Sequence, residues 1–298
     1  MLTRYKPSGK TSARLIPAAL VGAAIAVGLA WPYQALINWV PFIYINLVIW
    51  IGMAIVVGAI TVFVCSVGHN RNRLVGILVG AVIASAAVAG SHYWSYRSAR
   101  AEIREELAKD MSPAEVDELI ANEVTLRRYL DVRAEAGWSL GTRSSDGKGD
   151  LVGPVVWIIW GIEALGLLFA AVYMGGKGSP FCEKCNTSID EQPLFTRTDL
   201  DLGDLGAITE AQHVEALVEI PPRSEPSSGG LRVKYAAHVC PTCDGDVYLT
   251  VTSVMPSVKE DDSDEEKTVH EEVVLQREHY NRLLALREEL HQSGNVAI

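Results

Sequence analysis

Sequence motifs for catalysis are missing from this 298-residue chain. It has no glycine-rich phosphate loop, no paired nucleophile and base, and no helical His-Glu metal motif. Its apolar stretches also lack charge, because only Glu163 of the 36 acidic residues lies within one of them. These absences favour a protein that is not an enzyme, and transporters usually carry several charges in their membrane segments.

Charge is concentrated in the C-terminal part of the chain. Beyond Gly175 there are 23 acidic and 11 basic residues, which give this part a net charge of −12. A strongly acidic region repels phosphate backbones, so we expect no nucleic-acid partner. We expect a protein partner instead.

Four apolar stretches are long enough to cross a hydrocarbon core about 30 Å thick. The first three predicted transmembrane helices lie within 15–96 and the fourth within 151–175. They cover residues 15–31, 42–67, 74–96 and 151–174. Trp31, Tyr33 and Trp39 predict an aromatic interface belt around a short turn that Pro41 closes.

Basic residues set the predicted orientation. Four lie in the tail 1–14 and two in the loop 68–73, whereas the turn 32–41 has none. Because loops rich in Lys and Arg stay in the cytoplasm, we expect the tail, this loop and the C-terminal half there, in a bacterial-type inner membrane. A signal peptide cleaved after Ala30 is the alternative for the first stretch, and it would leave this orientation unchanged.

Residues 97–150 are predicted to form an external helical hairpin and loop. Ser112-Pro113-Ala-Glu115 is a capping-box pattern with proline at the first helical position, so a helix should start there and continue to about residue 136. Its apolar side would fold back on residues 97–109. Such a hairpin is either a simple lid or a receptor for an external ligand.

Small residues recur every fourth position in the third stretch, at Gly76, Gly80 and Ala84. One face of this helix is therefore small enough for another helix to approach closely. Tight packing inside the chain is the first interpretation, and an oligomer formed through this face is the second.

Glu163 lies near the middle of the fourth stretch. A carboxylate at the bilayer centre costs about 2.5–3.5 kcal/mol, so it should face the interior of the bundle. Ser85, Thr61 and Asn46 lie at compatible depth. Glu163 is then either a neutral acid that fixes helix register or a proton or cation relay.

Two Cys-x-x-Cys pairs, Cys182 with Cys185 and Cys240 with Cys243, predict a structural zinc site. Neither pair is followed by the helical pattern of a thioredoxin-like redox site. Disulfides would need an oxidising compartment, and the predicted side is reducing. Cys65 is alone in the second stretch and is expected to be a small core residue.

This arrangement resembles the zinc ribbon family, in which two knuckles face each other and the second opens a β-hairpin. The β-rich runs 231–239 and 247–254 flank the second pair, as the resemblance implies. The 54 residues between Cys185 and Cys240 exceed the usual spacing of about 15–20. We therefore expect an insertion there, with a strand at 213–220 and a disordered turn at 221–230. After the second cysteine pair, the predicted elements of 176–298 are an acidic loop at 259–267, a strand at 269–275, a helix at 276–291 and a frayed end at 293–298.

The sequence thus predicts an α-helical membrane protein with four transmembrane helices and a small α+β cytoplasmic zinc-ribbon-like domain. Surrounded by membrane lipid, it would hold zinc and recruit or sense a protein partner at the cytoplasmic face. Two alternatives stay open. One is a transporter or membrane-complex subunit that uses Glu163, and the other is a metal or thiol sensor.

Overall fold

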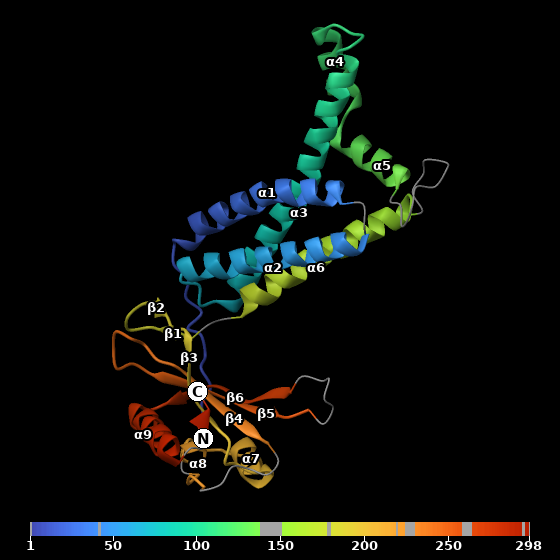
Figure 1. Ribbon diagram of the computed structural model, residues 1–298. Helices are drawn as coiled ribbons and strands as arrows, with labels where there is room; N and C mark the ends of the chain where they lie inside the picture. Colours follow the sequence, from blue (N-terminus) through green and yellow to red (C-terminus); the bar gives the residue numbers. More distant parts are fainter. Residues whose placement is uncertain are drawn as a thin grey trace. The chain divides into compact units, whose positions relative to one another are not determined.

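The computed structural model describes residues 2–40, 43–137, 151–177, 180–218, 220–223, 230–257, 264–293 and 296–297. The chain divides into two compact units, whose elements are labelled in Figure 1. Gly9–Gly178 form one, which we call the helical unit. Met1–Ser8 and Ser179–Ile298 form the other, which we call the sheet domain.

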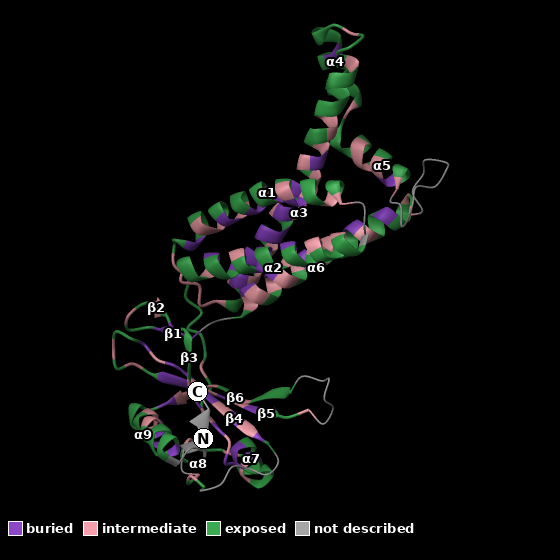
Figure 2. Ribbon diagram, viewed as in Figure 1, coloured by how far each residue is buried: buried purple, intermediate pink, exposed green. Residues whose placement is uncertain are grey.

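Four helices of the helical unit are long and apolar enough to cross a membrane. They are α1 (Leu15–Trp39), α2 (Ile43–Val67), α3 (Arg73–Leu107) and α6 (Pro154–Gly176). Their outward faces are exposed along much of their length (Figure 2) and carry large apolar side chains such as Ile16, Tyr44 and Phe169. Exposed apolar surface on this scale suits lipid rather than water. The chain is therefore an α-helical membrane protein, as predicted.

Helix α1 runs further than predicted. It continues through Pro32 to Trp39, where the sequence predicts a turn. A proline lacks the N–H that would bond to the preceding helical turn. Beyond the proline, Tyr33 and Ile37 pack in the apolar core of the helical unit, so packing holds this part of the chain in the helix. The predicted turn at 32–39 is therefore wrong.

The small-residue face of α3 packs against α6. A Cβ atom on Gly76 would collide with the carbonyl oxygen of Gly175, and one on Gly80 with that of Ala171. Ala84 is buried on the same face. The face is thus used inside the chain, and a second copy would reach it only by displacing α6.

The predicted hairpin contains more elements than expected. The third apolar stretch and residues 97–107 form one continuous helix, α3. Helix α4 (Pro113–Glu123) starts at the predicted capping box, in which the Ser112 N–H donates to Glu115 Oε2 at 3.0 Å. The chain then breaks at Thr125, whose Oγ1 accepts from the Arg128 N–H and caps a separate helix α5 (Leu126–Ala136). The predicted loop 141–150 lies outside the described residues.

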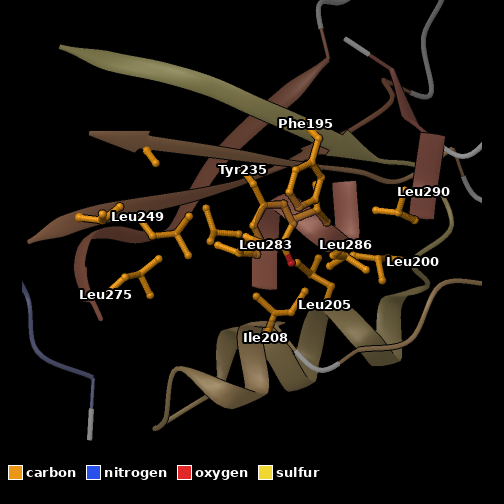
Figure 3. Packing of buried hydrophobic residues seen from close by; sticks show 14 of the residues in the cluster. Phe195, Leu200, Leu205, Ile208, Tyr235, Leu249, Leu275, Leu283, Leu286 and Leu290 are labelled. Carbon is orange, nitrogen blue, oxygen red and sulfur yellow. The ribbon is translucent and has the colours of Figure 1, made fainter. Parts of the chain in front are cut away.

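The sheet domain is built on five antiparallel strands in the order β6-β5-β4-β3-β7. They are β3 (Glu191–Arg197), β4 (Arg232–His238), β5 (Val247–Met255), β6 (Glu265–Leu275) and β7 (Val296–Ala297). One face packs on α7 (Leu202–Thr209) and α9 (Arg277–Ser293). Figure 3 shows Tyr235 and Leu249 pointing into this core with Leu283 of α9. None of the described residues of this core is a cysteine.

Strands β4 and β5 and helix α9 agree with the predicted runs, whereas the insertion differs. Residues 213–220 contain the short helix α8 (Glu215–Val218) rather than a strand, because a brief apolar run does not distinguish the two by periodicity. The insertion's strand is β3, in which Pro193 interrupts the regular register. The predicted frayed end contains β7, which pairs with β3. Residues 224–229 of the predicted turn and 259–263 of the predicted acidic loop lie outside the described residues. The rest of that loop was predicted wrongly, because Glu265–Lys267 already belong to β6, where they pair with β5.

The N-terminal tail belongs to the sheet domain as far as Ser8. The Val274 N–H donates to the Thr3 carbonyl, and the Tyr5 N–H donates to the Glu272 carbonyl, both at 2.8 Å. Arg4 forms an antiparallel bridge to Val273 between them. Residues 3–5 therefore extend the sheet at its β6 edge.

Candidate functional site

The first cysteine pair lies on a small hairpin. Strands β1 (Phe181–Cys182) and β2 (Thr187–Ser188) pair antiparallel, with Cys182 opposite Thr187. Asn186 closes the turn with a φ of 56°, a left-handed conformation that asparagine tolerates better than most residues. The Cys185 N–H points at the Cys182 sulfur, with 3.4 Å between nitrogen and Sγ. This tight turn brings both sulfurs of the pair to one side.

The second pair lies in the connection between β4 and β5, which starts after the paired residues His238 and Tyr248. A Cβ atom on Gly245 would lie 3.3 Å from the Cys243 sulfur and 3.6 Å from the Cys182 sulfur. A glycine here lets the backbone pass close to both sulfurs. The connection therefore closes over the cysteines.

The structure brings the four cysteines together. The Sγ atoms of Cys182, Cys185, Cys240 and Cys243 all lie within 4.8 Å of one another, and the Cys182 and Cys243 sulfurs are 3.5 Å apart. In a tetrahedral site with Zn–S bonds of about 2.3 Å, the sulfurs are about 3.8 Å apart. The cluster therefore has the donor set and the spacing that a tetrahedral metal ion requires.

The pKa shifts of two of the thiols also favour a bound cation. Backbone N–H groups of Thr242 and Cys243 lower the pKa of the Cys240 thiol. The neighbouring Cys243 sulfur raises the pKa of the Cys185 thiol. A second thiolate next to the first is unfavourable without a positive charge, and a divalent ion supplies it.

A small apolar cluster surrounds the sulfurs. Cys182 and Cys240 are buried with Ile189 and Tyr248, and Tyr5 of the tail packs edge-on against Tyr248 with ring centroids 4.8 Å apart. His238 is next to the site in sequence, but its Nδ1 lies 3.1 Å from the Ile189 carbonyl oxygen. That contact ties the β1–β2 hairpin to the sheet.

Comparison with protein-family models, curated proteins and solved structures found no match. Function is therefore inferred from the residues themselves. The chain is a membrane-anchored protein whose sheet domain holds a cluster of four cysteines with the geometry of a metal site.

Glu163 lies in α6 and lines a small cavity inside the helical unit. The Trp50 Nε1 of α2 donates to the Glu163 carbonyl oxygen at 3.2 Å, which fixes the backbone there. The predicted partners do not line this cavity. Ser85 is exposed, and the Thr61 hydroxyl donates to the Val57 carbonyl oxygen within α2. Asn46 does not line it either, so none of the three residues named at compatible depth reaches this cavity.

Other polar groups reach the cavity instead. Tyr33 and Gln34 come from α1, Ser91 and His92 from α3, and Arg133 from α5. Sequence reasoning missed these residues. Tyr33 and Gln34 fell in the predicted turn, and His92 fell near the end of a span. Arg133 follows Leu130 by three positions, so it lies near the apolar side of α5, which is the one signal that pointed to it.

Proposed function

We propose that the protein is a membrane-anchored zinc protein that binds a protein partner through its sheet domain at the cytoplasmic face. The observation that supports this proposal most directly is the cluster of four sulfurs within 4.8 Å of one another. The zinc has a structural role in this proposal, because four thiolates leave no open position for a substrate.

Zinc suits the cluster better than harder ions do. Thiolates are soft ligands, and a tetrahedral set of four is typical of zinc or of iron–sulfur chemistry. Two short turns that each supply both of their sulfurs to one point favour a single ion, as in the zinc-ribbon resemblance. A metal or thiol sensor would use the same four sulfurs. In a sensor, however, the metal would have to leave the site readily, or the sulfurs would have to react readily with an oxidant.

The N-terminal tail supports one side of the membrane for both chain ends. Residues 3–5 pair with β6, so the tail and the sheet domain belong to one folded unit. An even number of crossings between them is required, and α1, α2, α3 and α6 supply four. Basic residues of the tail and of the loop 68–73 favour the cytoplasmic side.

One face of the sheet suits a protein partner. Thr196, Lys234 and Thr252 lie opposite one another across β3, β4 and β5, and all three are half-buried. Helices α7 and α9 pack on the other face. A surface of mixed polar groups beside an acidic region suits a transient protein interface better than a nucleic-acid site.

The metal can be tested by elemental analysis of the purified full-length protein. We expect about one zinc per chain in the wild type and a loss of zinc on changing Cys240 and Cys243 to Ser together. Cys65→Ser is the matched control and should keep its zinc. An unchanged zinc content in the double variant would contradict the site.

The partner can be tested by cross-linked affinity purification from membranes. One protein should be recovered with the wild type and with Glu163→Gln, but not with the Cys240 and Cys243 double variant or after deletion of residues 181–298. Recovery of the same protein with the deletion variant would show that the partner binds the helical unit, and it would contradict the proposal.

A further inference from the structure

The helical unit contains a cavity of about 30 Å³ that polar and apolar side chains line together. Its polar lining comes from four helices and consists of Tyr33, Gln34, Ser91, His92, Arg133 and Glu163. A space of this size holds about one or two water molecules, and water needs two to four polar partners of this kind. The cavity is therefore polar and hydratable, and it is too small for an organic substrate.

Arg133 is placed in the cavity by hydrogen bonds on two sides. Its Nη1 donates to the Ser95 hydroxyl at 2.8 Å and to the Tyr129 hydroxyl at 3.1 Å. The Ser95 hydroxyl in turn donates to Gln34 Oε1 at 2.8 Å. These contacts bind α5 to α3 and, through Ser95, to α1.

Helix α5 is also fixed to the start of α6. The Gly153 N–H donates to the Ala134 carbonyl oxygen at 2.7 Å, and Ala134 is buried with Val156 and Trp160. The guanidinium therefore reaches the cavity from a helix outside the four long apolar ones.

Glu163 is held by its backbone, and its carboxyl group is left for the cavity. Trp50 donates to the Glu163 carbonyl oxygen, and a Cβ atom on Gly166 would collide with the Trp50 ring. In the described part of the chain the carboxyl has no hydrogen-bond partner and forms no ion pair with Arg133. Both side chains nevertheless line the same cavity.

We propose that this cavity is a proton-binding site in which the Glu163 carboxylate takes a proton from water and returns it to water. Arg133, which α5 brings to the cavity, sets how tightly the proton is held. The titratable or charged groups around the carboxyl are Tyr33, His92 and Arg133. The guanidinium disfavours a metal cation beside it, whereas a proton on Glu163 removes a charge without requiring a ligand set.

The proposal is tested by pH-induced infrared difference spectroscopy on the full-length protein in lipid nanodiscs. The wild type should show a band from a protonated carboxyl group that titrates with pH, and Glu163→Gln should remove it. Arg133→Gln should move the titration midpoint of this band to higher pH by about one unit or more, because an opposite charge nearby favours the ionised carboxyl.

Two further variants keep the result interpretable. Arg133→Lys preserves the charge and should restore most of the wild-type midpoint, and Arg127→Gln removes a charge from the exposed side of α5 and should leave it unchanged. A band that survives in Glu163→Gln would overturn the proposal. A Glu163 carboxyl that does not titrate with pH would also overturn it. The same holds if Arg127→Gln shifts the titration midpoint as much as Arg133→Gln does. Zinc content and partner recovery should not change in these variants, so this test fails or succeeds independently of the cysteine cluster.

Discussion

Removing the metal from the sheet domain should unfold the two cysteine turns and leave the sheet folded. The perturbation is a paired change of Cys182 and Cys240 to Ser, or a chelator applied to the wild type. The reason is that the domain has two separate apolar clusters, and only one of them contains the cysteines. Small zinc domains without a second core lose their whole fold with the metal.

The expected magnitude follows from the two clusters. The almost fully buried leucines of the main core include Leu249, Leu275, Leu283 and Leu290. At about 1.5–3 kcal/mol each, their burial contributes about 6–12 kcal/mol as an upper estimate. The cysteine cluster contains one buried aliphatic residue, Ile189, which contributes about 1.5–3 kcal/mol. Ordering each residue of the turns costs about 1 kcal/mol of conformational entropy, so the turns do not stay folded without the metal.

Hydrogen–deuterium exchange with mass spectrometry on the full-length protein measures this directly. Peptides covering 181–189 and 239–246 should exchange much faster after metal removal. Protection in α9 should fall by less than about tenfold, because its leucines belong to the core without cysteines. Loss of protection throughout α9 would show that the main core depends on the metal, which would refute the prediction. Unchanged exchange in both turns would show that the metal does not hold them folded.

Two more predictions follow from the structure. Gly80→Val should lower the thermal stability of the purified protein strongly, because the side chain meets the backbone at Ala171; Gly161→Val is the control, since a Cβ atom there meets nothing within 4 Å. Burial and the nearby Glu271 raise the pKa of Glu272 from about 4.5 to about 7, so the folded state binds more protons than the unfolded state between these values. Stability should therefore fall as pH rises from about 4.5 to about 7, and Glu272→Gln should reduce this loss, as measured by hydrogen exchange in β6 at two pH values.

The elements with strong local signals were predictable. Uninterrupted apolar length identified the four long helices, and the Ser112 capping box identified the start of α4. Local rules failed where a distant group decides the outcome. Pro32 predicts a helix end, but α1 continues past it because Tyr33 and Ile37 pack in the core of the helical unit. The pairing of β7 with β3 is likewise long-range and leaves no local pattern.

The two candidate sites also differ in how far local sequence patterns could predict them. The cysteine cluster could be predicted because each Cys-x-x-Cys pair is a complete local unit and only the meeting of the two is long-range. The lining of the Glu163 cavity could not be, because His92 and Arg133 come from helices whose register is set by packing. Each of these residues has an ordinary structural interpretation when it is considered alone.

The pairing of residues 3–5 with β6 has a consequence for biosynthesis. The tail is synthesised before all four long helices, and its partner strand is synthesised after them, so this edge of the sheet stays open until β6 has been synthesised. Closing a loop of this length in a free chain costs entropy that grows slowly with length. If all four long helices cross the membrane, as proposed above, their insertion would bring both segments to one side, and closure of the sheet would follow it. A fusion at the N-terminus would then act on the assembly of a domain whose other residues are Ser179–Ile298.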